Sequence, residues 1–186
     1  MDRHNTALTA WSFGLVGATY LAFALNLIRL GYWRSPRNGA GLALLGAAIC
    51  TALWGWLTVA GALVGETPLE LLATLADVFR YGSWFAFLLL LTGPRKLADR
   101  PTDGKALAAA GVVLVLGAMV IHVVTNLGDG PLPSGTRPGS LSSLLLAIFG
   151  LVLGEQMFRN ISPDSRWNAK PVSLALAGTV AFDVYV

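Results

Sequence analysis

Five long runs of apolar residues, each with few charged side chains, constrain this sequence more than any other feature. They cover about residues 7–29, 40–64, 69–92, 105–127 and 140–158. A bilayer hydrocarbon core of about 30 Å is crossed by roughly 20 residues of α-helix, because each residue adds about 1.5 Å. A helix also satisfies its own backbone hydrogen bonds, as lipid requires. The runs therefore predict an all-α, polytopic transmembrane helical bundle.

A sixth apolar run follows Pro171 and is still apolar where the chain ends at Val186. Residues 171–186 would form a helix of only about 24 Å, which is shorter than the bilayer core. We therefore expect about six helices in a single transmembrane domain over residues 1–186, with the last helix truncated.

The composition agrees with a membrane environment and excludes several other classes. Charged residues make up 12% of the chain, whereas soluble domains contain about 25%. The net charge of +3 does not indicate nucleic-acid binding, because most Lys and Arg residues lie in or beside the short connectors. The single cysteine, Cys50, excludes an internal disulfide, and His4 and His122 are too few to build a metal centre. We expect the lipid bilayer as the partner, no metal and no cofactor.

The distribution of basic residues predicts the orientation of the chain. Ten of them follow the first, third and fifth runs: Arg29, Arg34, Arg37, Arg95, Lys96, Arg100, Lys105, Arg159, Arg166 and Lys170. Only Arg3 and Arg137 lie on the opposite side. Because Lys and Arg are enriched in cytoplasmic loops, the N-terminus is predicted to lie outside the cytoplasm. Six helices would also leave the C-terminal end outside, so a cytoplasmic output domain needs at least one more helix.

No motif of a soluble catalytic site is present. The sequence has no phosphate-binding Gly-rich loop and no GxSxG, HExxH or CxxC motif. This chain therefore contains no predicted catalytic residue. Gly150 and Gly154 form a GxxxG pattern, which lets two helix backbones approach closely and predicts helix packing.

Ionisable residues inside the apolar runs are the main candidates for function, because a charge in hydrocarbon is costly. Asp77 and Arg80 are three residues apart and would share one face of a helix. Glu155 and Arg159 are four residues apart and predict a structural ion pair. Both pairs are explained most simply as buried struts that hold helices in register.

With the predicted orientation, several polar residues fall in the outer half of the membrane. They are Asp77, Arg80, His122, Asn126 and Asp183. If these side chains converge, they form a candidate sensing cluster. Such a cluster could receive a ligand, sense periplasmic pH through His122, or only satisfy the hydrogen bonds of its own members.

Three segments near the end of the chain match, in order, a pattern of a known family. Residues 155–160 (EQMFRN), 166–171 (RWNAKP) and 182–185 (FDVY) resemble the EQ-[LM]-[YF]-RN, RW-x-x-K and [FY]-D-x-Y elements of PrsK-type sensor histidine kinases. Residues 80–84 (RYGSW) and 51–54 (TALW) resemble elements of that family's third and second helices. These kinases accompany the exosortase/PEP-CTERM protein-sorting system of Gram-negative bacteria. The similarity extends through the whole chain and is densest from residue 150 onward.

The resemblance implies that the chain is the N-terminal sensory and anchoring region of a two-component histidine kinase in the bacterial inner membrane. The whole protein would be a homodimer that regulates exopolysaccharide and exosortase-linked gene expression through a response regulator. Further helices, a GAF-like domain and the ATP-dependent kinase core would follow this chain. The family's phosphoacceptor histidine and ATP-binding motifs have no counterpart here, so the resemblance assigns no catalytic residue.

A small helical-bundle membrane transporter is the alternative function. Transporters need a continuous polar path, often through broken helices near the midplane. The inner halves of the second, fourth and sixth runs are nearly free of polar residues, which argues against this class. A membrane enzyme is a third possibility, but too few His, Asp and Glu residues lie within the runs to assemble a catalytic site.

Overall fold

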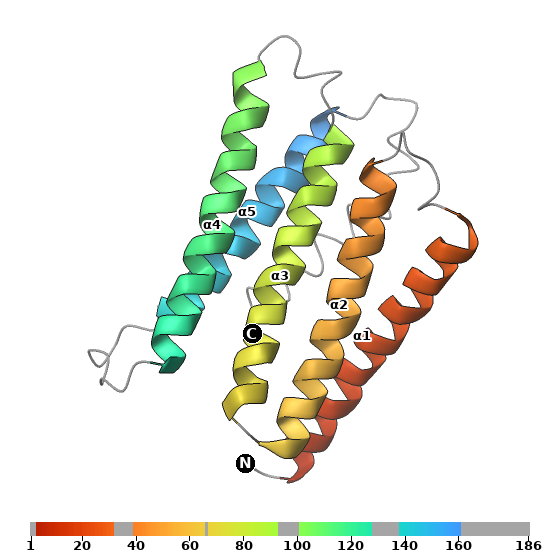
Figure 1. Ribbon diagram of the computed structural model, residues 1–186, viewed down its shortest axis with the longest axis vertical. Helices are drawn as coiled ribbons and strands as arrows, with labels where there is room; N and C mark the ends of the chain where they lie inside the picture. Colours follow the sequence, from red (N-terminus) through yellow and green to blue (C-terminus); the bar gives the residue numbers. More distant parts are fainter. Residues whose placement is uncertain (1–2, 32–38, 66, 93–100, 128–137, 161–186) are drawn as a thin grey trace. The chain divides into compact units, whose positions relative to one another are not determined.

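The computed structural model describes the chain except for residues 1–2, 32–38, 66, 93–100, 128–137 and 161–186. In the described part, the regular structure is helical, and no strand occurs there (Figure 1). The helices are α1 (Arg3–Arg29), α2 (Gly39–Val64), α3 (Thr67–Thr92), α4 (Pro101–Leu127) and α5 (Pro138–Asn160). The all-α prediction is confirmed, and each predicted run lies within one helix. The predicted sixth helix, 171–186, lies outside the described residues.

The helices extend beyond the apolar runs at several ends. α4 starts at Pro101, four residues before the apolar run expected from 105, and α5 starts at Pro138, two residues before the run expected from 140. Proline is favoured in the first helical turn, because its missing N–H would have no helical partner there. Hydropathy thus marks the part of each helix that enters lipid and omits its polar first turn.

The five helices of the described residues are each long and apolar enough to cross a bilayer. The spanning segments are Ala10–Arg29, Gly39–Val64, Pro68–Leu91, Gly104–Asn126 and Gly139–Arg159. The shortest of them has 20 residues, and about 20 residues are needed to cross the hydrocarbon core. The chain is a multi-pass membrane protein.

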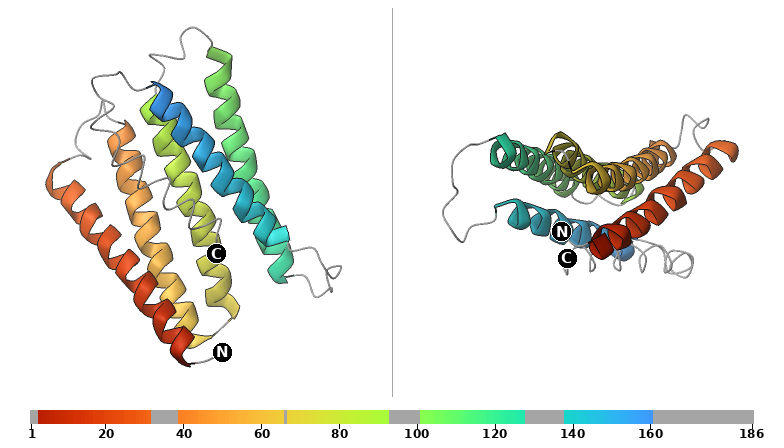
Figure 2. Two further views of the ribbon diagram at one scale, coloured as in Figure 1. Left: turned by 180° about the vertical axis from the view of Figure 1, so that it is seen from behind. Right: turned by 90° about the horizontal axis from the view of Figure 1, so that it is seen from below.

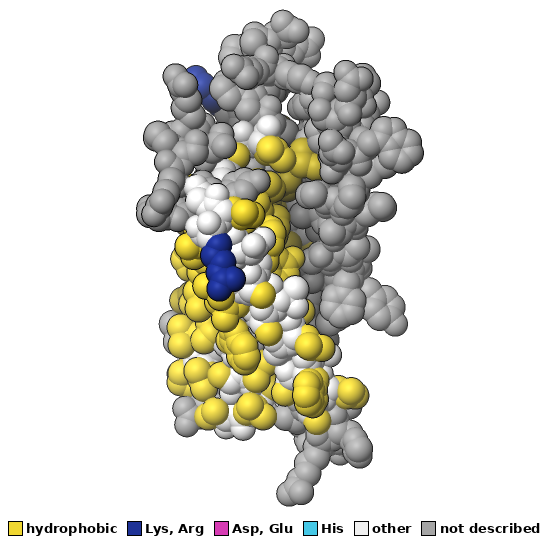
Figure 3. Space-filling view, turned by 90° about the vertical axis from the view of Figure 1, so that its right-hand side faces the viewer, with side chains coloured by type: hydrophobic (Ala, Val, Ile, Leu, Met, Phe, Trp, Pro, Cys, Tyr) yellow, Lys and Arg dark blue, Asp and Glu magenta, His cyan; other side chains and the backbone are white. Residues whose placement is uncertain are grey.

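The exterior of the helices is apolar, as a lipid environment requires. On α4, Val113 is 69% exposed and Val120 and Val124 are each 61% exposed. Soluble monomers rarely expose continuous apolar patches of more than a few hundred Å². On the face drawn in Figure 3, the described side chains are mostly hydrophobic. These exposed side chains are suited to contact with lipid acyl chains.

The chain divides into two compact units, Met1–Ser83 and Trp84–Val186. The first unit contains α1, α2 and the beginning of α3, and the second contains the end of α3 together with α4 and α5. The single domain predicted over 1–186 stays a prediction. Each unit is described by itself below.

In the first unit, α1 and α2 are antiparallel neighbours (Figures 1 and 2). Their backbones meet where Gly55 of α2 faces Gly17 of α1. A Cβ atom at position 55 would lie 2.9 Å from the Phe13 carbonyl oxygen and 3.0 Å from the Gly17 nitrogen. Only glycine therefore allows this close crossing, as at small-residue crossings of other membrane helices.

A short connection joins α2 to α3. Gly65 follows α2 directly, has a φ of 69°, and donates its N–H to the Gly61 carbonyl at 2.8 Å. This left-handed conformation is a common way to end a helix, and glycine adopts it without steric cost. α3 starts at Thr67, two positions after Gly65 in the sequence.

In the second unit, α4 and α5 pack against each other in antiparallel directions (Figure 1). Gly111 of α4 leaves room for the ring of Phe149 of α5, because a Cβ there would lie 3.1 Å from Phe149 Cε1. Phe149 in turn meets Phe85, at the end of α3, edge to face with 5.0 Å between ring centroids. Leu88 and Leu146 are the largest fully buried side chains of this unit.

Candidate functional site

Arg80 is a buried charged residue in the middle of a membrane-spanning helix. It is 5% exposed, and α3 spans the membrane over Pro68–Leu91. A charge in this position is costly unless other groups compensate it. Arg80 and its contacts therefore form the candidate functional site.

Asp77 compensates the charge of Arg80 from one turn earlier on the same helix. Arg80 Nε donates to Asp77 Oδ1 at 2.8 Å, and Arg80 Nη2 lies 2.7 Å from the same oxygen. The Arg80 side chain is 6% exposed and that of Asp77 is 26% exposed. The sequence spacing of three residues predicted this pairing on one helix face.

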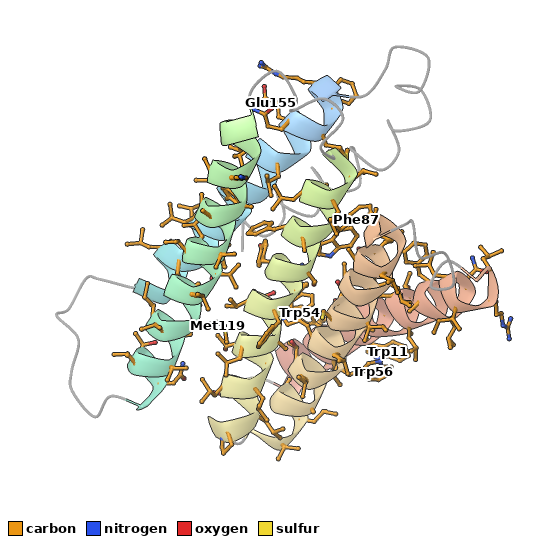
Figure 4. The ribbon with its side chains drawn as sticks, turned by 45° about the horizontal axis from the view of Figure 1, so that its top comes forward. Trp11, Trp54, Trp56, Phe87, Met119 and Glu155 are labelled. Carbon is orange, nitrogen blue, oxygen red and sulfur yellow. The ribbon has the colours of Figure 1, made fainter. Side chains whose placement is uncertain are left out.

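Aromatic rings cover the Arg80 guanidinium. Its Cζ lies 4.1 Å from the ring centroid of Trp54, on α2, and 4.6 Å from that of Tyr81. Cation–π contacts of this kind are worth about 0.5–2 kcal/mol, with the larger values in desolvated sites. Trp54 points from α2 toward α3 (Figure 4).

Trp54 also contacts the first helix. Its ring meets that of Phe13, on α1, edge to face, with centroids 5.2 Å apart and an interplanar angle of 89°. Phe13, Trp54, Asp77, Arg80 and Tyr81 form a continuous group, which we call the Arg80 cluster. The Arg80 cluster links α1, α2 and α3 within the first unit. Its contacts join three helices, so its geometry suits structural coupling between them.

A second polar contact joins α4 and α5. The Ser142 hydroxyl donates to the Gly139 carbonyl at 2.8 Å and lies 3.2 Å from His122 Nε2. The Ser142 hydroxyl and His122 Nε2 are thus within hydrogen-bond distance, and the His122 tautomer decides which of the two donates. Gly139 fits closely beside the same ring, since a Cβ there would lie 3.2 Å from His122 Cε1.

Replacing Ser142 with alanine should destabilise the contact between α4 and α5 by about 1 kcal/mol, the usual net value of one hydrogen bond. Unfolding of the chain in detergent micelles, followed by circular dichroism, measures this loss. Ser143→Ala is the matched control, because the Ser143 hydroxyl donates to Gly139 O within its own helix. Equal stability of the two variants would contradict a contribution from the His122–Ser142 contact.

The described residues include four of the five members of the predicted sensing cluster. Asp77 and Arg80 contact each other in the first unit. In the second unit, Asn126 donates its side-chain N–H to the His122 carbonyl at 2.8 Å. Asp183 lies outside the described residues. The convergence of all five residues therefore stays a prediction. Among the described residues, no group of three or more His, Cys, Asp or Glu side chains is placed to hold a metal ion.

Glu155 and Arg159 pair as their spacing predicts, with Arg159 Nη2 2.6 Å from Glu155 Oε1. Their side chains are 59% and 71% exposed, respectively, so this pair is not the buried strut that was expected. Both partners belong to the last turns of α5 and reach away from the packed face of that helix. Gly150 is buried and Gly154 half-buried, on the α5 face that also buries Leu153.

Sequence reasoning identified the ion pair but did not assign the aromatic partners of Arg80 or the role of Ser142. Sequence spacing reveals contacts within one helix, whereas the partners of Trp54 and Ser142 lie on a different helix. In the sequence, Ser142 is one of three serines in the first turns of α5 and does not stand out from the others. Comparisons of the chain with protein-family models, with curated proteins and with solved structures gave no match.

Proposed function

We propose that this chain is the membrane-embedded sensory and anchoring region of a two-component histidine kinase of the bacterial inner membrane. The kinase would regulate exopolysaccharide production and the PEP-CTERM/exosortase system. The order of the motifs at residues 155–160, 166–171 and 182–185 supports this identity. The absence of catalytic motifs from the sequence agrees with a region that detects a stimulus and leaves phosphoryl transfer to later domains.

The observation that supports a sensory role is the Arg80 cluster. Arg80 is buried, and its partners come from its own helix and from α2, which in turn contacts α1 through Trp54 and Phe13. A change at the Asp77–Arg80 pair would alter the contact with Trp54 and so the packing of all three helices. Packed helices switch between discrete arrangements rather than deforming continuously, so a local change can be transmitted along them.

In this mechanism a stimulus favours one of two helix packings. The stimulus must interact differently with the two packings, because a ligand shifts an equilibrium only by its differential affinity. The preferred packing then passes through the following helices to a dimeric kinase core, which phosphorylates its response regulator. Homodimerisation and the response regulator follow from the family resemblance and are part of the proposal.

The test joins the chain to the kinase domains that this proposal places after it and replaces the ion pair by a neutral pair, Asp77→Asn with Arg80→Gln. Exchanging both charged partners avoids leaving one charge buried alone, so this double variant is expected to fold. If the pair takes part in sensing, the kinase should lose its response to the stimulus, measured as autophosphorylation in proteoliposomes and as target-gene expression in cells.

The matched control neutralises the exposed pair, Glu155→Gln with Arg159→Gln, and should respond as the unmodified kinase does. An unchanged response of the folded Asp77/Arg80 double variant would refute the sensory role of this pair. The kinase assignment itself would fail if the gene encodes no histidine-containing dimerisation helix and no ATP-binding core after residue 186.

A further inference from the structure

The chain passes from its first compact unit to its second inside α3, directly after Ser83. α3 is one continuous helix through this position (Figure 1). Tyr81 and Phe85, on either side, are 6% and 3% exposed, whereas Gly82 and Ser83 are half-buried. The packing of α3 thus changes at the step from Gly82 to Ser83 while its helical backbone continues.

Before this step, α3 is held by the first unit. The Arg80 guanidinium lies 4.1 Å from the ring centroid of Trp54, which belongs to α2. The same side chain pairs with Asp77 at 2.7 Å and is 6% exposed. The cation–π contact therefore holds the first part of α3 against α2.

After this step, α3 is held by the second unit. The Phe85 ring meets that of Phe149, on α5, edge to face, with centroids 5.0 Å apart. A Cβ at Gly111 of α4 would lie 3.9 Å from Phe85 Cδ2, so the same ring also lies beside α4. Leu88, about one turn later, is 2% exposed. The last part of α3 therefore packs with a different set of helices from the first part.

The backbone hydrogen bonds of α3 have a competitor at this step. The Ser83 hydroxyl, as a donor, lies 3.0 Å from the Phe79 carbonyl oxygen and 2.8 Å from the Arg80 carbonyl oxygen. In an α-helix these carbonyls accept the backbone N–H groups of residues 83 and 84, four positions later. Side-chain bonds of this kind often bend helices. Gly82 adds backbone freedom next to Ser83, and Gly/Ser pairs are among the few causes of sharp kinks.

We propose that the Gly82–Ser83 step is a hinge at which α3 bends between residues 67–81 and residues 84–92. Bending lengthens the backbone hydrogen bonds on one side of a helix, and lipid offers no water to replace them. Serine hydroxyls satisfy backbone groups that are freed in this way in membrane helices. The Ser83 hydroxyl already contacts the two carbonyls that the bend would free, so it lowers the cost of bending.

The test measures bending within α3 alone. Spin labels are attached to Leu72→Cys and Leu90→Cys of the full chain, in a Cys50→Ser background, because both leucines are about half exposed. These positions are 18 residues apart and lie about 27 Å from each other along a straight helix. Double electron–electron resonance in lipid nanodiscs gives the distribution of the distance between the labels.

A label pair on α4 provides the width expected of a helix without this hinge. Ala106→Cys and Val124→Cys are also 18 residues apart, and both positions are exposed. The distribution for α3 should be broader than that for α4. Ser83→Ala should narrow the α3 distribution to the α4 width, because a bent helix then has no hydroxyl to replace its lengthened bonds. Gly82→Ala should narrow it as well and is a second, independent variant.

Thr74→Ala is the matched control on the same helix. The Thr74 hydroxyl donates to the Glu70 carbonyl at 2.9 Å, which is the same kind of bond at a position within the first unit. This variant should leave the α3 distribution broad. The proposal is overturned if the unmodified α3 is already as narrow as α4, if neither Ser83→Ala nor Gly82→Ala narrows it, or if Thr74→Ala narrows it equally.

The hinge also bears on the proposed function, because it lies about one turn from Arg80. A bend there would decide how much of a change at the Arg80 cluster reaches the end of α3 that contacts α5. That consequence rests on the proposed function. The distance measurement requires no kinase domain, so failure of the kinase assignment and failure of the hinge are distinguishable.

Discussion

Arg80→Ala should destabilise the chain by about 3 kcal/mol or more, the largest loss we expect from a single side chain. Removing one partner of a buried ion pair leaves the other charge uncompensated, which costs about 3–5 kcal/mol. Here that charge is Asp77, inside the membrane-spanning segment of α3, where a carboxylate that has lost its arginine is costly. The same substitution also removes the cation–π contact between the Arg80 guanidinium and the Trp54 ring. Unfolding in mixed micelles, followed by circular dichroism, measures the loss.

Arg159→Ala is the matched control for this prediction. It also removes an arginine from an ion pair within one helix, but both partners are more than half exposed. Exposed pairs contribute about 0–1 kcal/mol, so this variant should stay close to the unmodified chain. Similar losses for Arg80→Ala and Arg159→Ala would contradict the role assigned to burial and to the aromatic partners.

Gly55→Val should separate α1 from α2 and destabilise the first unit by about 2–3 kcal/mol. A Cβ at this position would lie within 3.1 Å of three backbone atoms, Phe13 O, Gly17 N and Gly17 Cα. Backbone atoms cannot move aside as a side chain can, so the two helices must shift apart. Overpacking of this kind typically costs about 1–3 kcal/mol. When the two helices shift apart, we expect the edge-to-face contact between Phe13 and Trp54 to be lost as well.

Gly46→Val, on the same helix, is the control, because it makes the same glycine-to-valine change away from the contact between α1 and α2. No atom lies within 4 Å of a Cβ at position 46, so this variant should change stability by less than about 0.5 kcal/mol. Disulfide cross-linking between Gly14→Cys and Val59→Cys, in a Cys50→Ser background, reports the distance between α1 and α2. The cross-linking yield should fall with Gly55→Val and not with Gly46→Val. An unchanged yield would show that the crossing tolerates a side chain.

The positions of the helices were predictable because lipid imposes a simple rule. Each apolar run had to be long enough to cross the bilayer and could satisfy its backbone only as a helix. The five described helices accordingly contain the five predicted runs. The helix ends were less predictable, since a polar first turn such as that of α4, which starts at Pro101, does not belong to the apolar run.

Pairs within one helix were also predictable. The spacings Asp77–Arg80 and Glu155–Arg159 gave the correct partners, because residues three or four apart share one helix face. The spacing did not reveal that the first pair is largely buried and the second exposed. Burial depends on which side of the helix meets a neighbour, and apolar residues surround these helices on both the lipid side and the packed side. Hydrophobic periodicity therefore gives little guidance in a membrane helix.

The sequence by itself determined that this chain is a set of membrane-spanning helices and which charges could pair along each helix. Only the tertiary structure decided that Trp54 covers Arg80, that Ser142 contacts His122, and that Gly55 allows α1 and α2 to touch. The physical reason is distance along the chain. Contacts within a helix follow from its fixed geometry, whereas contacts between helices depend on how two surfaces rotate and approach, which small and aromatic residues decide together.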